Sequence, residues 1–141
     1  MEMKILVCHD GSERAQSALE KAVVMFRWAR PEIIIVTVVE EPADASSHDE
    51  EAFEQWRAKR EADLNQAADW VAKHGLVADA ILAVGDPRKM LMEAIRQKAP
   101  DLVVMTSRAR AETGIRFGNV TVSVSGYLLR HIVDCPLLLM H

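Results

Sequence analysis

Residues 4–22 read KILVCHDGSERAQSALEKA, and this stretch decides the fold class of the chain. It starts as an apolar run, passes through the turn residues Asp10, Gly11 and Ser12, and continues with apolar side chains at three- and four-residue spacing. The first pattern is typical of a buried β-strand, and the last is typical of an amphipathic helix. We therefore expect a strand, a tight turn and a helix in direct succession.

The same alternation continues to the end of the chain. Short apolar runs at residues 3–8, 33–39, about 77–84, 102–105 and 137–140 predict five strands. Helical patterns cover about residues 15–28 and 48–74, start again after residues 85–87, and return at about 122–132. Strands that alternate with helices form a parallel sheet with helices on both faces. The prediction is a single three-layer α/β domain over residues 1–141.

Composition limits the expected partners. The 141 residues carry 21 acidic and 17 basic side chains, a formal net charge of -4. Nucleic acids are bound through Lys and Arg, so we expect no nucleic-acid partner. No apolar run approaches the ~20 residues that span a bilayer, and the first one is too short for a signal peptide. We expect a cytoplasmic protein that does not insert into membranes.

Residues that carry chemistry in other proteins form no recognisable pattern here. Cys8 and Cys135 have neither a zinc spacing nor a CxxC spacing, so we expect buried, reduced thiols. The five histidines fall in different elements without a metal-ligand spacing, and G-x-S-x-G is absent from the sequence. We expect neither a metal site nor a catalytic residue. The tryptophans Trp28, Trp56 and Trp70 are expected to pack on helices, with Phe53, Trp56 and Leu64 covering the sheet.

Four blocks, in the same order, resemble the universal stress protein family over essentially the whole chain: KILVCHDGSERAQSALEKA, VGDPRKMLMEAI, APDLVVMTSRA and SVSGYLLRHIVDCPLLLM. The resemblance implies an adenine nucleotide alpha hydrolase-like fold with strand order 3-2-1-4-5. It also implies a non-enzymatic stress-response or regulatory homodimer with an unknown client protein. The dimer would form through the last strand, at Leu137, Leu138, Leu139 and Met140.

Family members that bind ATP carry the loop Gly-x-x-Gly, nine residues, then Gly-Ser or Gly-Thr, because backbone N–H groups must approach the phosphates closely. Here the three glycine positions align with Thr106, Ala109 and Val122, and twelve residues separate the last two. Losing two charge-assisted hydrogen bonds weakens binding by about 3 to 6 kcal/mol, or some 10²- to 10⁴-fold. We expect weak or lost nucleotide binding. The alternative is an ATP- or AMP-binding switch in which Gly114 and Gly118 rebuild the loop.

If nucleotide binding is retained, the resemblance implies a site at the carboxyl ends of the strands. The candidate residues are Cys8, Asp10, Val38, Thr106, Ser107, Arg108, Gly114, Gly118, Ser123, Val124 and Ser125. Asp10 matches the family residue beside the adenosine moiety, and it fits a local turn or helix cap equally well. Ser107 and Arg108, with Ser123 and Ser125, match phosphate-contacting positions. The two later serines also fit helix caps, and Arg108 also fits a solvated surface charge.

Overall fold

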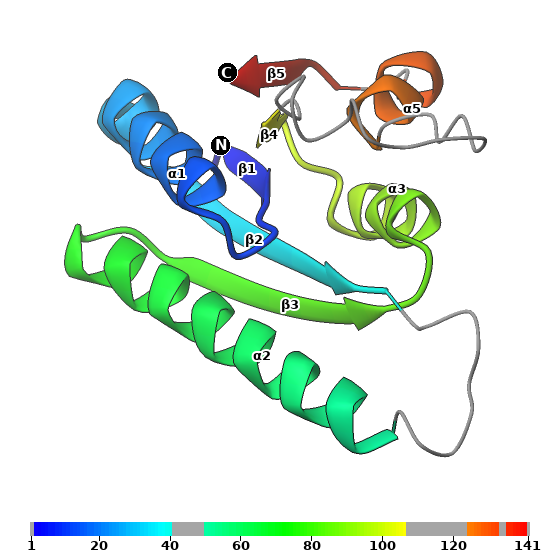
Figure 1. Ribbon diagram of the computed structural model, residues 1–141. Coiled ribbons are helices and arrows are strands. Elements are labelled where there is room, and N and C mark those ends of the chain that lie inside the picture. The colour runs from blue at the N-terminus through cyan, green and yellow to red at the C-terminus, as the bar shows by residue number, and fades with distance from the viewer. Residues whose placement is uncertain (1, 41–49, 107–123, 133–134, 141) are drawn as a thin grey trace.

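A computed structural model describes residues 2–40, 50–106, 124–132 and 135–140. Their five strands form one parallel sheet in the order β3-β2-β1-β4-β5, as predicted (Figure 1). The strands are β1 (Lys4–Cys8), β2 (Glu32–Val39), β3 (Ala78–Val84), β4 (Leu102–Thr106) and β5 (Leu137–Met140). The helices in these segments are α1 (Glu13–Phe26), α2 (Glu50–Lys73), α3 (Pro87–Lys98) and α5 (Val124–His131), with a 3-10 turn at Arg27–Ala29.

The centre of the sheet is β1, which is paired on both sides. Its residue Ile5 lies opposite Ile33 of β2 and Leu102 of β4. Successive side chains of a strand point to opposite faces, so central strands buried on both faces are apolar throughout. This is the reason why β1 and β2 read as continuous apolar runs in the sequence.

The helices lie on both sides of the sheet (Figure 1), and an apolar layer of side chains holds them to each face. The layer under α1 and α2 contains Leu19, Val23, Leu64, Val71, Ile5, Val7, Ile33 and Ile35, among others. The layer under α3 and α5 contains Leu91, Ile95, Leu128, Leu6, Ile34, Val36, Val103 and Met105, among others. Burial of these side chains, at roughly 1.5 to 3 kcal/mol each, is the main source of stability for the sheet and its helices.

The prediction that Trp56 covers the sheet was wrong. Its side chain is 44% exposed, and the buried residues of α2 begin only at Leu64. With 24 residues α2 is about 36 Å long, whereas the seven residues of β3 span about 23 Å. The first turns of α2 therefore have no sheet beneath them.

Other packing predictions also need correction. Trp28 is 81% exposed because it lies in the 3-10 turn beyond the end of α1. Trp70 does pack against the apolar layer of α1 and α2, although it is only partly buried. Cys8 and Cys135 were expected to be buried, but as whole residues both are partly exposed, each lying at the end of a strand or next to one; the thiol group of Cys8 is itself buried. Within the segments described, no helix is long and apolar enough to cross a membrane.

Candidate functional site

A cavity of about 270 Å³ lies at the carboxyl edge of the sheet. It sits where the strand order reverses, since β2 and β3 follow on one side of β1 while β4 and β5 follow on the other. Ligands of open α/β sheets bind at this kind of position. The volume lies just below the roughly 300 Å³ at which small-molecule sites begin. The lining residues are Cys8, His9, Asp10, Val36, Val38, Glu40, Trp56, Arg60, Pro87, Leu91, Met105, Thr106 and Val124.

The structure brings five of the predicted site residues together in this lining: Cys8, Asp10, Val38, Thr106 and Val124. They come from the ends of three neighbouring strands and from the start of α5. The predicted residues Ser107, Arg108, Gly114, Gly118 and Ser123 lie outside the described residues, as does the side chain of Ser125.

The turn after β1 is built by Asp10, Gly11 and Ser12. The Asp10 carboxylate accepts a hydrogen bond from the Ser12 backbone N–H at 3.0 Å. The Ser12 hydroxyl in turn accepts one from the Ala15 N–H at 3.1 Å, so Ser12 is the N-cap of α1. Of the two roles foreseen for Asp10, the local turn is confirmed, and the contact with adenosine stays a prediction. The carboxylate still lines the cavity.

The electrostatic surroundings of Asp10 keep it ionised. Partial burial alone would raise its pKa, but the hydrogen bonds from Ser12 and the positive charge of Arg60 outweigh that effect. The net result is a pKa of Asp10 below its ordinary value. The cavity therefore holds a negatively charged acceptor for hydrogen bonds from a ligand.

Hydrogen bonds fix the ring of His9 within the fold. The side chain is only 5% exposed, and its Nδ1 accepts from the Gly11 N–H at 3.0 Å. The hydrogen of the neutral ring is then on Nε2, which donates to Gln16 Oε1 at 3.0 Å. Gln16 Nε2 donates to Glu20 at 3.0 Å. Through Nδ1 the ring of His9 thus holds the turn itself, and through Nε2 it ties the turn to α1.

Arg60 reaches from α2 to the strand ends. Its Nη2 lies 3.4 Å from the carbonyl oxygen of His9 and 3.5 Å from the Thr37 hydroxyl, which itself donates to that carbonyl. Burial lowers the pKa of Arg60, and the charges of Asp10 and Asp63 partly offset this effect. Its Nε is buried without a hydrogen-bond partner among the described residues. Such an unpaired donor costs about 1 to 3 kcal/mol.

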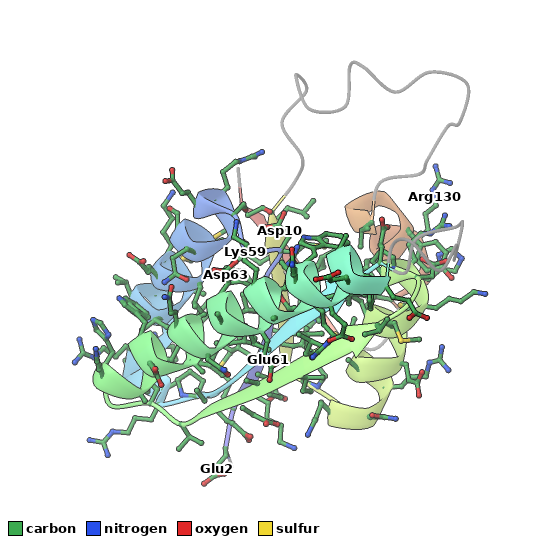
Figure 2. All side chains as sticks on the ribbon, turned by 60° about the horizontal axis from the view of Figure 1, so that its bottom comes forward. Glu2, Asp10, Lys59, Glu61, Asp63 and Arg130 are labelled. Atoms are coloured by element: carbon green, nitrogen blue, oxygen red, sulfur yellow. The ribbon has the colours of Figure 1, made fainter. Side chains whose placement is uncertain are left out.

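The helix α2 also presses on Gly11. A Cβ at this position would lie 3.0 Å from Asp63 Oδ2 and 3.3 Å from Arg60 Nε. Figure 2 shows Asp63 on α2 close to Asp10, where this helix passes the turn. Glycine is therefore favoured by its positive φ of 83°, and a larger residue would also require the side chains of Asp63 or Arg60 to shift by a few tenths of an ångström.

Cys8 lines the cavity with an unreactive thiol. Burial raises its pKa to about 12, so the thiol is protonated at neutral pH. A cysteine needs its thiolate form to act as a nucleophile or to bind a metal. In the described part of the chain, no three His, Cys, Asp or Glu residues are grouped for a metal ion.

Sequence reasoning did not include several lining residues in the site. Glu40 and Pro87 follow the ends of β2 and β3 directly or within three residues, and this position alone marks them for the carboxyl edge. Trp56 and Arg60 are four residues apart and so share a face of α2. No local pattern indicates that this face reaches the cavity.

Comparisons with known proteins agree on one family. The family model of the universal stress protein family matches residues 1–141. A solved structure of a universal stress protein family member from Burkholderia pseudomallei is 28% identical, with a TM-score of 0.70 over 97% of this chain and 94% of that chain.

Two other solved structures share the fold at lower identity. The universal stress protein UspA from Lactobacillus plantarum is 19% identical, with a TM-score of 0.77 over 99% of this chain and 97% of that one. The universal stress protein from Archaeoglobus fulgidus in complex with dAMP is 16% identical, with a TM-score of 0.68 over 100% and 98%. A search of the curated proteins found no match. The chain belongs to the universal stress protein family.

Proposed function

We propose that this universal stress protein is a non-enzymatic, cytoplasmic regulator that acts as a homodimer and binds an adenine nucleotide weakly, through its adenosine part. The observation that carries the proposal is the cavity at the reversal point of the sheet, with the Asp10 carboxylate in its wall. It would act by binding a client protein.

The walls of the cavity fit a base and a sugar. Val38, Leu91 and Met105 supply apolar surface for a planar heterocycle, and the ionised Asp10 can accept a hydrogen bond from a ribose hydroxyl. Relatives support the ligand class, since structures of universal stress proteins contain AMP in Arabidopsis thaliana, dAMP in Archaeoglobus fulgidus, and cAMP in a further case. All three ligands share an adenine base and one phosphate.

The sequence indicates that this protein would bind the phosphates of a nucleotide weakly. Thr106, Ala109 and Val122 stand where ATP-binding relatives have glycine, so fewer backbone N–H groups can approach a phosphate chain. The nucleoside part of the ligand should therefore supply most of the affinity. A loop rebuilt around Gly114 and Gly118 would produce the opposite result, with ATP bound much more tightly than AMP.

Three reactive side chains in the cavity wall, Cys8, His9 and Asp10, already have structural roles or lack the reactive form. Cys8 is protonated, His9 uses both ring nitrogens, and Asp10 accepts the turn hydrogen bond from Ser12. A general base needs a free acceptor in reach of the proton that it removes. Cys8 has no thiolate and His9 has no free acceptor, and we assign the remaining acceptor capacity of Asp10 to a ribose hydroxyl, so these three residues favour binding over hydrolysis.

The outer edge of β5, on the side away from β4, supports the proposal of a homodimer. Leu137–Met140 pairs with β4 on one side, and β5 is the last strand of the sheet. An apolar edge strand offers unpaired backbone groups to a second chain. Pairing with its own copy about a two-fold axis would cover both edges at once.

Isothermal titration with AMP and with adenosine tests the ligand class. We expect binding of both ligands with dissociation constants above the low micromolar range. Asp10→Asn should weaken it about 5- to 10-fold, because the side chain keeps the turn but loses the charge. Asp79→Asn is the matched control, since Asp79 pairs with Lys98 and does not line the cavity. Absence of binding at millimolar ligand would contradict the adenosine site, and low micromolar binding would contradict the proposed weakness.

A further inference from the structure

Trp56 occupies an unusual place for a large aromatic side chain. It lines the cavity, yet 44% of it is exposed, and it sits two turns before Leu64, where the buried stripe of α2 begins. Packing of the helix on the sheet therefore does not account for this ring. An apolar ring that stands half in solvent at the wall of a cavity is available to a ligand.

Helix α2 and the apolar wall of the cavity belong to opposite faces of the sheet. α2 packs on the same face as α1, through Leu64, Ala67 and Val71. The apolar wall of the cavity is formed by Val36, Leu91 and Met105, which belong to the opposite layer. The first turns of α2 therefore reach the strand ends, where Trp56 shares the cavity lining with Leu91 of α3 and Met105 of β4.

Arg60 fixes these turns relative to the strands. It lies one helical turn after Trp56 and lines the same cavity. Its Nη2 contacts the His9 carbonyl of the first strand exit and the Thr37 hydroxyl of β2. Asp63, one turn further on, lies against Gly11 (Figure 2). Arg60 and Asp63 thus hold two successive turns of α2 at the strand ends, next to the turn that carries Trp56.

We propose that Trp56 is a specificity-determining residue that stacks on the heterocyclic base of the ligand and closes the cavity from the α2 side. The inference rests on the proposed function, and it adds that the ligand is selected by its aromatic base rather than by its sugar phosphate. The opposite wall, with Val38 and Leu91, supplies the second apolar surface. Stacking of this kind accepts any flat base, so Trp56 would select ligands that carry a base over those that do not, and other residues would choose among the bases.

Fluorescence of Trp56 gives a direct readout. In the Trp28→Phe/Trp70→Phe double variant, Trp56 is the only tryptophan left of three. Adenosine and AMP should change its emission along a saturable curve, and ribose 5-phosphate at the same concentration should leave it unchanged. Titration calorimetry on the same double variant checks that the two replacements leave the adenosine affinity intact.

Substitutions at Trp56 test the contribution to affinity. Trp56→Ala should weaken adenosine binding by roughly 5- to 150-fold, and Trp56→Phe, which keeps a ring, should recover much of the loss. Trp28→Ala is the matched control, because that tryptophan is 81% exposed and does not line the cavity. Its affinity for adenosine should equal that of the wild type.

The outcomes separate this inference from the function on which it rests. If adenosine binds the wild type but neither the Trp56 emission nor the affinity of Trp56→Ala changes, the stacking is wrong and the adenosine site stands. If emission and affinity respond to ribose 5-phosphate as strongly as to adenosine, selection by the base is wrong. If millimolar adenosine gives no binding to the wild type, both the site and the stacking are wrong.

Discussion

Replacing Gly11 with alanine tests how closely α2 fits over the turn that forms one wall of the cavity. Gly11 has φ +83°, a left-handed conformation that costs a residue with a Cβ about 1 to 2 kcal/mol. The new methyl group would also lie 3.0 Å from Asp63 Oδ2 and 3.3 Å from Arg60 Nε. Both atoms belong to side chains that can shift, so we add about 1 kcal/mol for crowding, the low end for overpacking. The expected loss of unfolding free energy is about 2 to 3 kcal/mol.

Gly75 provides a control that separates the two contributions. Its φ is +82°, and a Cβ there would meet no atom within 4 Å, so Gly75→Ala reports the backbone cost alone. We expect Gly11→Ala to lower the free energy of unfolding in urea by about 1 kcal/mol more than Gly75→Ala does. Adding Asp63→Ala to Gly11→Ala should recover part of that difference. Equal losses for the two glycine variants would refute the close fit of α2 over the turn.

The pH dependence of stability, the exposure of Trp56 and the edge of β5 can be tested separately. The pKa of Asp10 in the folded chain lies below its ordinary value, so its stabilising effect is present above about pH 4 and is lost as the pH falls through the folded pKa. Acid unfolding followed by circular dichroism should therefore show a smaller loss for Asp10→Asn than for the wild type, and identical curves would contradict the Ser12 contact. Trp56→Ala should lower the free energy of unfolding in urea by less than about 1.5 kcal/mol, because Trp56 is 44% exposed. Leu19→Ala should lower it by about 2 to 5 kcal/mol, because Leu19 is 0% exposed. Equal losses would place Trp56 in the core. Leu138→Lys should yield monomers in sedimentation velocity while Leu138→Met stays dimeric, and a dimeric lysine variant with a native melting curve would place the interface elsewhere.

The centre of the sheet was predictable because β1, β2 and β4 are largely buried, whereas β3 and β5 are only partly buried. The run at residues 33–39 can only lie inside a covered parallel sheet, and β2 is observed at Glu32–Val39. The last strand was predicted at the residues where it is observed, Leu137–Met140. Turn residues fixed the remaining boundaries, since Gly85 and Pro87 punctuate the passage from β3 to α3.

Residues that follow strand ends could be assigned to the carboxyl edge of the sheet from the sequence, whereas residues of α2 could not. The family resemblance implied Cys8, Asp10 and Thr106, and these residues do line one cavity because parallel strands bring their carboxyl ends to one edge; their role in nucleotide binding stays a prediction. The positions of Trp56 and Arg60 depend on how far α2 extends beyond the strands that it covers. Helical periodicity predicts which face of a helix is apolar, but not which of its turns have a sheet beneath them. The wrong prediction for Trp56 and the omission of Arg60 have this common cause.

The ratio of the affinities for ATP and AMP is the most direct test of a site that holds adenosine and leaves the phosphates largely unbound. Isothermal titration of both nucleotides with magnesium, on the full chain, measures it. We expect the two dissociation constants to agree within about threefold, a difference below roughly 0.7 kcal/mol, and to lie above the low micromolar range. ATP binding in the low micromolar range, 100-fold or more tighter than AMP by about 2.7 kcal/mol, would contradict this expectation and would assign the phosphates to a loop rebuilt around Gly114 and Gly118.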